Sequence, residues 1–312
     1  MPIFTYEPPT PAAPAPPDIV SGLRIGQYDL DGYHFGAWTD PVQVVAGGDV
    51  YTPGEVRNQD QENPRGEDVW FGRDYATPGV REFTFTMEDL TDVRPALSEL
   101  AAAWRPAYRS QPGRYGILRW REGDTVYRQF VRPRDFTIAP QRVANIKRRT
   151  VVAKLRCRDA VAFADDEHSI TLDLVNEVTS TGLLFPNAFP WSFGESTQST
   201  RTNIARVDSP TPTPMRIAIT GPVVGSATRL KLWAPSWQLD FGSLTLWPGQ
   251  VLEVDTYART ARVGGASVTG SLTHTSVLSA LLQPGTTEFR FDATDDSATT
   301  TATIYWRDTV PI

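Results

Sequence analysis

The sequence predicts a mainly β protein in which a β-sandwich-like domain with one α-helix precedes a second, all-β sandwich. Three observations predict this fold class. The 312 residues exceed the usual size of one domain. Short stretches that alternate apolar and polar residues recur along the chain, separated by Gly and Pro. A single amphipathic helical pattern interrupts them, and it falls in the first half.

A proline-rich arm, residues 1–20, precedes the first domain, which we expect to span residues 21–175. The arm contains PPTPAAPAPP, which favours extended polyproline II or a loosely draped tail. Alternating stretches then predict strands at 25–30, 33–38, 41–45 and 80–87. Residues 52–79 are poor in aliphatic residues and rich in charge, Gly and Pro, which predicts a long loop.

The one predicted helix covers about residues 92–104. Thr91 or Asp92 can cap its start, and Pro95 falls in the first turn, where no backbone N–H is needed. An apolar stripe at helical spacing comprises Leu97, Leu100, Ala101 and Trp104. Further along, residues 150–158 alternate apolar and basic side chains. Cys157 lies on the apolar side, which predicts a buried structural thiol.

The second domain is expected at residues 214–312, after a junction over residues 176–213. Gly, Pro, Ser, Thr and Asn dominate the junction, which ends in SPTPTP. After it, about eight short alternating stretches with Pro-Gly turns predict a sandwich or jelly roll.

Composition excludes several classes of protein. The single Cys rules out a disulfide framework, and three scattered His residues with one Cys do not make a zinc site. We therefore expect no metal and no cofactor. No apolar run reaches the length of a membrane span, and the N-terminus does not read as a secretory signal. The chain is expected to be made in a cytoplasm and to act soluble or in an assembly.

Five strings carry a resemblance to a known family. They are YGILRWREGDTVYRQFVRPRDFTIAP (115–140), RTVVAKLRCRDAVAF (149–163), PMRIAITGPV (214–223), LTLWPGQVLEVDTYARTARVGG (244–265) and LLQPGTTEFRF (281–291). Together with the order of domains, they resemble the distal tail proteins, often termed minor tail proteins, of long non-contractile-tailed bacteriophages (siphophages). The long acidic loop departs from the simplest members.

The resemblance implies a structural virion protein of the tail tip or baseplate, not an enzyme. In that family the first domain assembles into a ring, a hexamer, that meets the tail tube protein. The second domain, galectin-like or carbohydrate-module-like, projects outward and holds receptor-binding or tail-lysin proteins. A carbohydrate-binding adhesin is the alternative, and host cell-wall glycan is then a partner.

The charges are strongly segregated along the chain. Residues 49–92 carry eleven acidic and four basic side chains, whereas residues 105–158 carry fifteen basic and three acidic ones. If these segments lie on opposite edges, copies can join head to tail into a ring. The candidate contacts between subunits are Arg142, Lys147, Arg148, Arg149, Glu62, Glu67 and Asp68. In the alternative, the two segments pair within one fold across adjacent strands.

Three tryptophans of the second domain, Trp233, Trp237 and Trp247, are candidate contacts for a saccharide or a partner protein. Aromatic rings also fill sandwich cores, so packing is the alternative. Trp233 and Trp237 flank Pro235 in a loop-like string, which makes them the better candidates for exposure. Trp306 shares a strand face with Ile304 and is expected to be buried.

Other chemistry finds little support. Aromatic residues interleave with the basic segment as in a single-strand binder, but the flanks are acidic and the pI is about 5.2, so no stable nucleic acid binding is expected. The Asp165-Asp166-Glu167 run fits a solvated turn better than a glycosidase pair. The DxDG string at 29–32 lacks the remaining ligands of a calcium loop, and no GxSxG elbow occurs.

Overall fold

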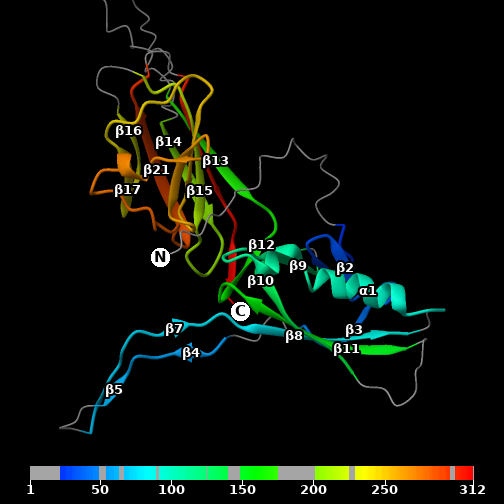
Figure 1. The fold of residues 1–312 in the computed structure, drawn as a ribbon. Coiled ribbons are helices and arrows are strands. Elements are labelled where there is room, and N and C mark those ends of the chain that lie inside the picture. Colours follow the sequence, from blue (N-terminus) through cyan, green and yellow to red (C-terminus); the bar gives the residue numbers. More distant parts are fainter. Residues whose placement is uncertain are drawn as a thin grey trace, which may run out of the picture. The chain divides into compact units, whose positions relative to one another are not determined.

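A computed structural model describes residues 22–48, 54–62, 67–88, 91–123, 125–139, 148–174, 201–224, 229–295 and 299–311. The proline-rich arm lies outside these ranges. The chain divides into two units. Unit 1 comprises Met1–Asp166 and Thr309–Ile312, and unit 2 comprises Glu167–Asp308. Each unit is built mainly from antiparallel strands, as predicted (Figure 1).

Unit 1 is built on a nine-stranded sheet. Its main path runs β2 (Tyr33–Phe35), β1 (Tyr28–Leu30), β9 (Gly116–Glu122), β10 (Thr125–Ile138), β11 (Arg149–Cys157), β8 (Val80–Met87) and β3 (Gln43–Gly47). Off this path, β12 (Val161–Ala164) pairs with β10 and with β23 (Thr309–Pro311). All these ladders are antiparallel.

The two ends of this sheet meet. Gly36, directly after β2, forms a bridge with Gln43 at the start of β3. The ring of Phe35 packs edge-on against Phe83 and Phe85 of β8, with centroids 5.7 and 5.3 Å apart. One half of the sheet thus covers the other around a shared core, which is the β-sandwich-like arrangement expected. Alternation places Phe83 and Phe85 inside and leaves intervening residues such as Glu82 outside.

Helix α1 (Arg94–Ala103) packs on this core through Leu100 and Trp104, which are fully buried. The Trp104 ring lies 5.3 Å from that of Phe85. Its indole N–H donates to the carbonyl of Lys154 at 3.2 Å, so the helix is tied to β11 as well as to the aromatic core. A short 3-10 turn, η2 (Ala107–Ser110), follows.

The start of α1 differs in detail from the prediction. Val93 occupies the cap position, and Pro95 lies in the first turn as expected. The Asp92 carboxylate still accepts the backbone N–H of Arg94 at 2.9 Å, so an acidic side chain serves the helix start one residue earlier. The buried stripe is Ala96, Leu100 and Trp104.

Unit 2 is a sandwich of two antiparallel sheets. The six-stranded sheet runs β13 (His168–Asp173), β22 (Thr301–Trp306), β15 (Met215–Thr220), β18 (Val251–Asp255), β19 (Thr260–Val263) and β20 (Ala266–Ser267). The four-stranded sheet runs β14 (Thr202–Val207), β21 (Gly285–Ala293), β16 (Leu230–Ala234) and β17 (Trp237–Phe241). A 3-10 turn, η3 (Thr269–Ser271), lies between β20 and β21.

The core of unit 2 follows the predicted alternation. Ile217 and Ile304 are paired on β15 and β22, and Leu232 and Phe291 are paired on β16 and β21. All four are buried in one apolar cluster. Trp306 is buried in the same cluster, as expected.

The boundary of unit 2 differs from the predicted one at residue 214. Strands β13 and β14 already belong to it, and β14 lies inside the stretch 176–213 that was expected to be a junction. Within that stretch, residues 176–200 fall outside the described ranges. The SPTPTP string connects two strands of the same unit, so its proline-rich composition marks a loop inside unit 2 and not a domain linker.

The end of the chain returns to unit 1. Strand β23 pairs with β12, with Ala162 opposite Val310 and Phe163 opposite Thr309. Unit 2 is therefore an insertion between Asp166 and Thr309 of unit 1. The expectation that residues 214–312 form one domain was wrong for these last residues, because a three-residue strand carries no local signal of its distant partner.

Candidate interaction surfaces

The stretch predicted as a long loop is a two-stranded arm, defined here as residues 54–62 and 67–79. Strand β4 (Val56–Arg57) pairs with β7 (Tyr75–Ala76), and β5 (Gln61–Glu62) pairs with β6 (Val69–Trp70). Both ladders are separate from the nine-stranded sheet (Figure 1). The loop prediction was wrong because both faces of the arm are exposed, which leaves no alternation to detect.

Two glycines of the arm lie so close to the backbone of the opposite strand that no side chain fits there. A Cβ on Gly54 would lie 1.7 Å from the carbonyl oxygen of Thr77, and one on Gly72 would lie 2.2 Å from that of Gln59. The Asp60 carboxylate accepts the backbone N–H of Gly72 at 2.9 Å. Only glycine fits at both positions, and Asp60 satisfies a donor between the two ladders, so the sequence supports the paired form.

The arm exposes large apolar side chains. Phe71 is 88% exposed and Trp70 is 59% exposed. The others are Val56, Val69 and Tyr75. Trp70 lies opposite Gln61 in its ladder and Val69 lies opposite Glu62, so both faces carry an apolar residue. Exposing these apolar side chains to water does not stabilise a two-stranded ribbon. Their exposure therefore indicates an interaction surface.

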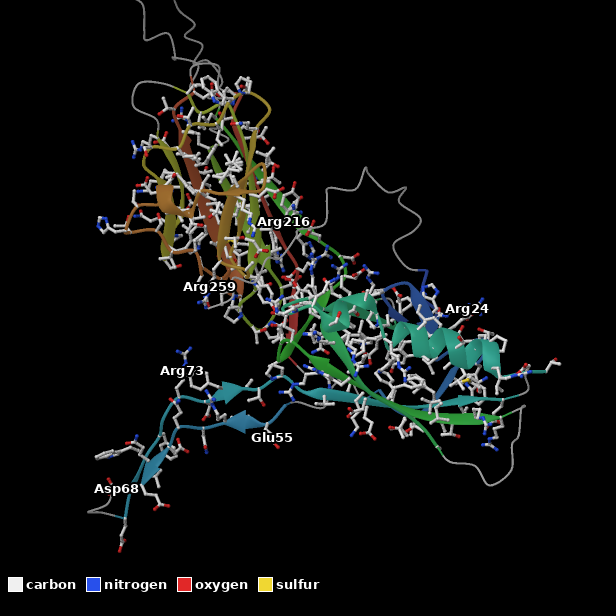
Figure 2. The ribbon with its side chains drawn as sticks, viewed as in Figure 1. Arg24, Glu55, Asp68, Arg73, Arg216 and Arg259 are labelled. Atoms are coloured by element: carbon white, nitrogen blue, oxygen red, sulfur yellow. The ribbon has the colours of Figure 1, made fainter. Side chains whose placement is uncertain are left out.

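The arm also carries exposed acidic residues. The predicted contact residues Glu62, Glu67 and Asp68 all lie on it and are exposed. Neither Glu62 nor Glu67 makes an ion pair with another residue in the described ranges. Figure 2 shows the labelled Glu55, Asp68 and Arg73 side chains along the arm. The guanidinium of Arg73 lies 5.4 Å from the centroid of the Tyr75 ring.

The basic candidates are only partly described. Arg142 and Lys147 lie outside the described residues. Arg148 makes an ion pair with Glu88 at 2.7 Å, and Arg149 lies opposite Met87 at the start of the β11–β8 ladder. The alternative prediction, pairing across adjacent strands of one fold, therefore holds for Arg148. A contact of these residues with another subunit stays a prediction.

A groove of about 510 Å³ lies on the outside of the nine-stranded sheet, across β8, β10 and β11. Its lining residues are Val80, Glu82, Arg134, Asp135, Lys154 and Arg156. Lys154 donates to Glu82 at 2.8 Å, a hydrogen bond that raises the pKa of Lys154. Arg134 and Arg156 make no ion pair within the described part of the chain. The groove thus holds two guanidinium groups without a described ion pair, beside the carboxylates of Glu82 and Asp135.

Two of the carboxylates tested for catalysis, Asp165 and Glu167, form ion pairs. Asp165 forms ion pairs with Arg119 and Arg128. Glu167 accepts from Arg216 at 3.3 Å and from Arg307 at 3.4 Å. Asp165 and Glu167 are thus engaged in ion pairs, whereas glycoside hydrolysis requires a facing pair of free carboxyl groups.

The DxDG string forms a turn between β1 and β2. Asp29 accepts the backbone N–H of Gly32 at 2.6 Å and pairs with Arg119 at 3.1 Å. Asp31 accepts from the Tyr108 hydroxyl at 2.7 Å. Burial and this hydrogen bond raise the pKa of Tyr108 far above its usual value. Among the described residues, no group of three His, Cys, Asp or Glu side chains is arranged to hold a metal ion.

Cys157 is buried, as predicted, and its thiol donates to the side-chain oxygen of Gln129 at 3.3 Å. Burial raises the pKa of this thiol, so it is kept protonated. No helix in the described ranges has the length and apolar character that a membrane crossing requires.

The three candidate tryptophans of unit 2 differ sharply. Trp237 is only 8% exposed, and its ring packs edge-on against Phe289 at 5.6 Å, so the expected exposure was wrong. The APSW string is a tight hairpin turn between β16 and β17, in which Trp237 starts the second strand facing inward. Trp233 is half-buried on the outward face, with the Lys231 ammonium 5.4 Å from its ring centroid. Trp247 is 61% exposed.

Comparisons with known sequences find no relative: no protein-family model matches the chain, and no curated protein is similar to it. Solved structures do match. The chain aligns with the Dit protein of phage SPP1, a paradigm of the hub adsorption apparatus in phages that infect Gram-positive bacteria. The TM-score is 0.60 at 12% sequence identity, over 91% of this chain and 98% of that chain.

A second match is a chain of the phage P2 baseplate in its activated conformation with Ca, and the same baseplate with Sr matches equally. Each gives a TM-score of 0.52 at 9% identity, over 92% of this chain and 99% of that chain. At these identities the likeness concerns the fold. The chain has the fold of a phage distal tail protein, which confirms the fold expected from the resemblance.

Sequence reasoning missed the apolar residues of the arm. The run Val69-Trp70-Phe71 lies in an otherwise polar stretch, and this contrast was the available signal. It also missed Trp38, which is 91% exposed in the turn between β2 and β3. A single tryptophan in a turn carries no pattern that would indicate its exposure.

Proposed function

We propose that this protein is a structural, non-enzymatic component of a phage tail tip that self-assembles into a ring. The ring would join the tail tube to the tip or baseplate, and unit 2 would hold receptor-binding or tail-lysin proteins. The protein would be made in the host cytoplasm and reside at the tail tip of the virion. The fold likeness, which spans 98% of the SPP1 Dit chain, supports this proposal.

One observation carries self-association: the arm keeps Trp70 and Phe71 in water on a ribbon with locked geometry. Exposed aromatic side chains on a rigid element are typical of interface anchors. A ring of identical subunits supplies the covering surface without a further gene product, because head-to-tail contacts close when their rotation allows. The family resemblance implies six copies.

The size of the purified protein tests the proposal. Multi-angle light scattering should give the mass of a closed oligomer, and negative-stain images should show rings with a central opening. A chain that stays monomeric in both measurements, even when the protein is concentrated, would contradict the proposal. A turnover number for a small-molecule reaction would contradict the non-enzymatic role.

The alternative, a carbohydrate-binding adhesin, rests on Trp247. This side chain is exposed at a tight turn, where its backbone N–H donates to the side chain of Gln250 at 2.9 Å. An exposed indole can stack on a sugar ring. Quenching of tryptophan fluorescence by host cell-wall polysaccharide, lost in W247A, would favour this function, whereas no response would leave unit 2 as a protein-binding module.

A further inference from the structure

Two turns of unit 1, residues 24–27 and residues 37–40, are called here the turn platform. The first turn leaves Ile25 69% exposed, and the second leaves Trp38 91% exposed. Turns are ordinarily made of Gly, Pro and small polar residues, because they meet solvent on most sides. Packing within unit 1 therefore does not explain an isoleucine and a tryptophan at these positions, and their joint exposure indicates a contact surface.

Hydrogen bonds fix the two turns to each other. The Asp40 carboxylate accepts the backbone N–H of Ala37 at 3.0 Å and the side-chain amide of Gln27 at 2.9 Å. The Arg24 guanidinium, labelled in Figure 2, donates to the hydroxyl of Thr39. Gln27 is only 6% exposed, so the network is shielded from water on one side. The two apolar side chains are thus presented on one rigid support.

The N-terminal sequence contains a segment with matching chemistry. Residues 8–17, called here the proline-rich segment, read PPTPAAPAPP. Every third position of this segment is a proline, namely Pro8, Pro11, Pro14 and Pro17. A polyproline II helix has three residues per turn, so in that conformation the four prolines form one row with a spacing of about 9 Å. The other two edges carry one proline each, so the apolar row lies on a single edge.

Proline rows and exposed aromatic rings are complementary. Polyproline II binds aromatic surfaces with a small loss of conformational entropy, because the segment is extended before it binds. The proline-rich segment contains no charged residue, so its docking would bury no charge. Trp38 supplies the aromatic face, and Ile25 supplies an apolar neighbour.

The segment is also tethered close to the platform. Pro17 is five residues before Gly22, where the described part of the chain begins, so the two lie at most roughly 18 Å apart. Leu23 is 5% exposed and anchors the chain directly before the first turn. A short tether gives an effective concentration on the order of millimolar, so even a weak contact is formed within one chain.

We propose that the proline-rich segment docks on the turn platform of its own chain, with its row of four prolines against Trp38 and Ile25. The contact goes beyond the proposed ring function and does not depend on it, since both surfaces belong to a single chain. It covers the Trp38 ring in the free protein and fixes the start of the chain to unit 1.

Fluorine NMR of the full-length chain labelled with fluorotryptophan tests the contact. W38F identifies the Trp38 signal, and a soluble paramagnetic agent then broadens each signal according to the exposure of its ring. Trp247 is the internal reference, because it is 61% exposed and lies in unit 2. Without docking, Trp38 would be broadened more strongly than Trp247. We expect the opposite order in the wild type, because the segment covers one face of the Trp38 ring.

Proline substitutions supply the matched pair of variants. P11A/P14A interrupts the row, whereas P9A/P16A removes the same number of prolines from the other edges. The broadening of Trp38 should rise about twofold in P11A/P14A, since the second face of the ring becomes exposed, and should stay at the wild-type level in P9A/P16A. The remaining tryptophan signals confirm that each variant is folded. An unchanged Trp38 signal in P11A/P14A, or an equal rise in both variants, would overturn the docking.

Disulfide trapping distinguishes docking within one chain from docking on a neighbour. A chain carrying P14C and I25C is mildly oxidised and then analysed under denaturing conditions. We expect a link within single chains, and the native Cys157 is buried and does not compete. The control is P14C with V56C, because Val56 is 63% exposed but lies on the two-stranded arm. Links between two chains, or equal linking in the control, would overturn the inference.

Discussion

Replacing Trp237 by alanine should destabilise unit 2 strongly. The side chain is almost fully buried and packs edge-on against Phe289 at 5.6 Å. A buried aromatic side chain removes about 150–250 Å² from water, which at about 25 cal/mol per Å² corresponds to about 4–6 kcal/mol. Because neighbours relax partly into the cavity, we expect a loss of about 3–5 kcal/mol.

Hydrogen exchange measured by mass spectrometry can follow the stability of unit 2 separately from that of unit 1. Peptides from β16, β17 and β21 should exchange more than about a hundredfold faster, since each 1.4 kcal/mol corresponds to a factor of about ten. Peptides from unit 1 should not change. W247A is the matched control, because the indole of Trp247 is mostly exposed and its loss should change stability by less than about 0.5 kcal/mol. Equal exchange in the two variants would refute the packing argument.

Three further predictions follow from unit 1. G72A should open the arm, because the added Cβ would collide with the backbone of Gln59, and limited proteolysis should then cut the arm faster than in the wild type. The control is G270A, where no atom lies near the added Cβ. Equal cutting of the arm in the two variants would contradict the geometry. Raising the pH should destabilise unit 1: burial raises the pKa of Tyr33 to about 12 and those of Tyr108 and Cys157 above their usual values. The unfolded chain therefore loses these protons first, and the urea midpoint should fall as the pH rises above about 9, less so in Y108F. R148E should change stability by less than about 1 kcal/mol, because its pair with Glu88 is well exposed, yet weaken assembly; assembly indifferent to R148E and to salt would remove the charge argument.

The parts of the fold that could be predicted from the sequence are those with a local period. The stripe that includes Leu100 and Trp104 predicts the helix because it covers two turns in sequence. The alternation around Ile217 and Ile304 predicts core strands for the same reason. In both cases the burial of a side chain follows from its near neighbours along the chain.

The parts of the fold that could not be predicted from the sequence depend on pairing between distant residues. Nothing near Thr309–Pro311 indicates that it pairs with β12, more than a hundred residues earlier. The arm lacks an apolar period because both of its faces meet solvent, so its pairing rests on glycine clearances and on Asp60. These are contacts between residues that only the fold brings together.

The candidate contacts show the same division. The charge segregation drew attention to the acidic arm and to the basic strand, but it could not tell that Arg148 is paired with Glu88. For the tryptophans, a two-residue hairpin turn decides that Trp237 faces inward, and composition around Pro235 suggested the opposite.

The insertion of unit 2 between Asp166 and Thr309 gives the protein a modular design. His168, the first residue of β13, lies directly opposite Trp306, the last of β22, so the inserted segment starts and finishes at neighbouring points. An inserted segment with neighbouring ends can be replaced by another one while the final strand of the host sheet is retained. Sequence changes can then accumulate in unit 2 without altering the surfaces of unit 1.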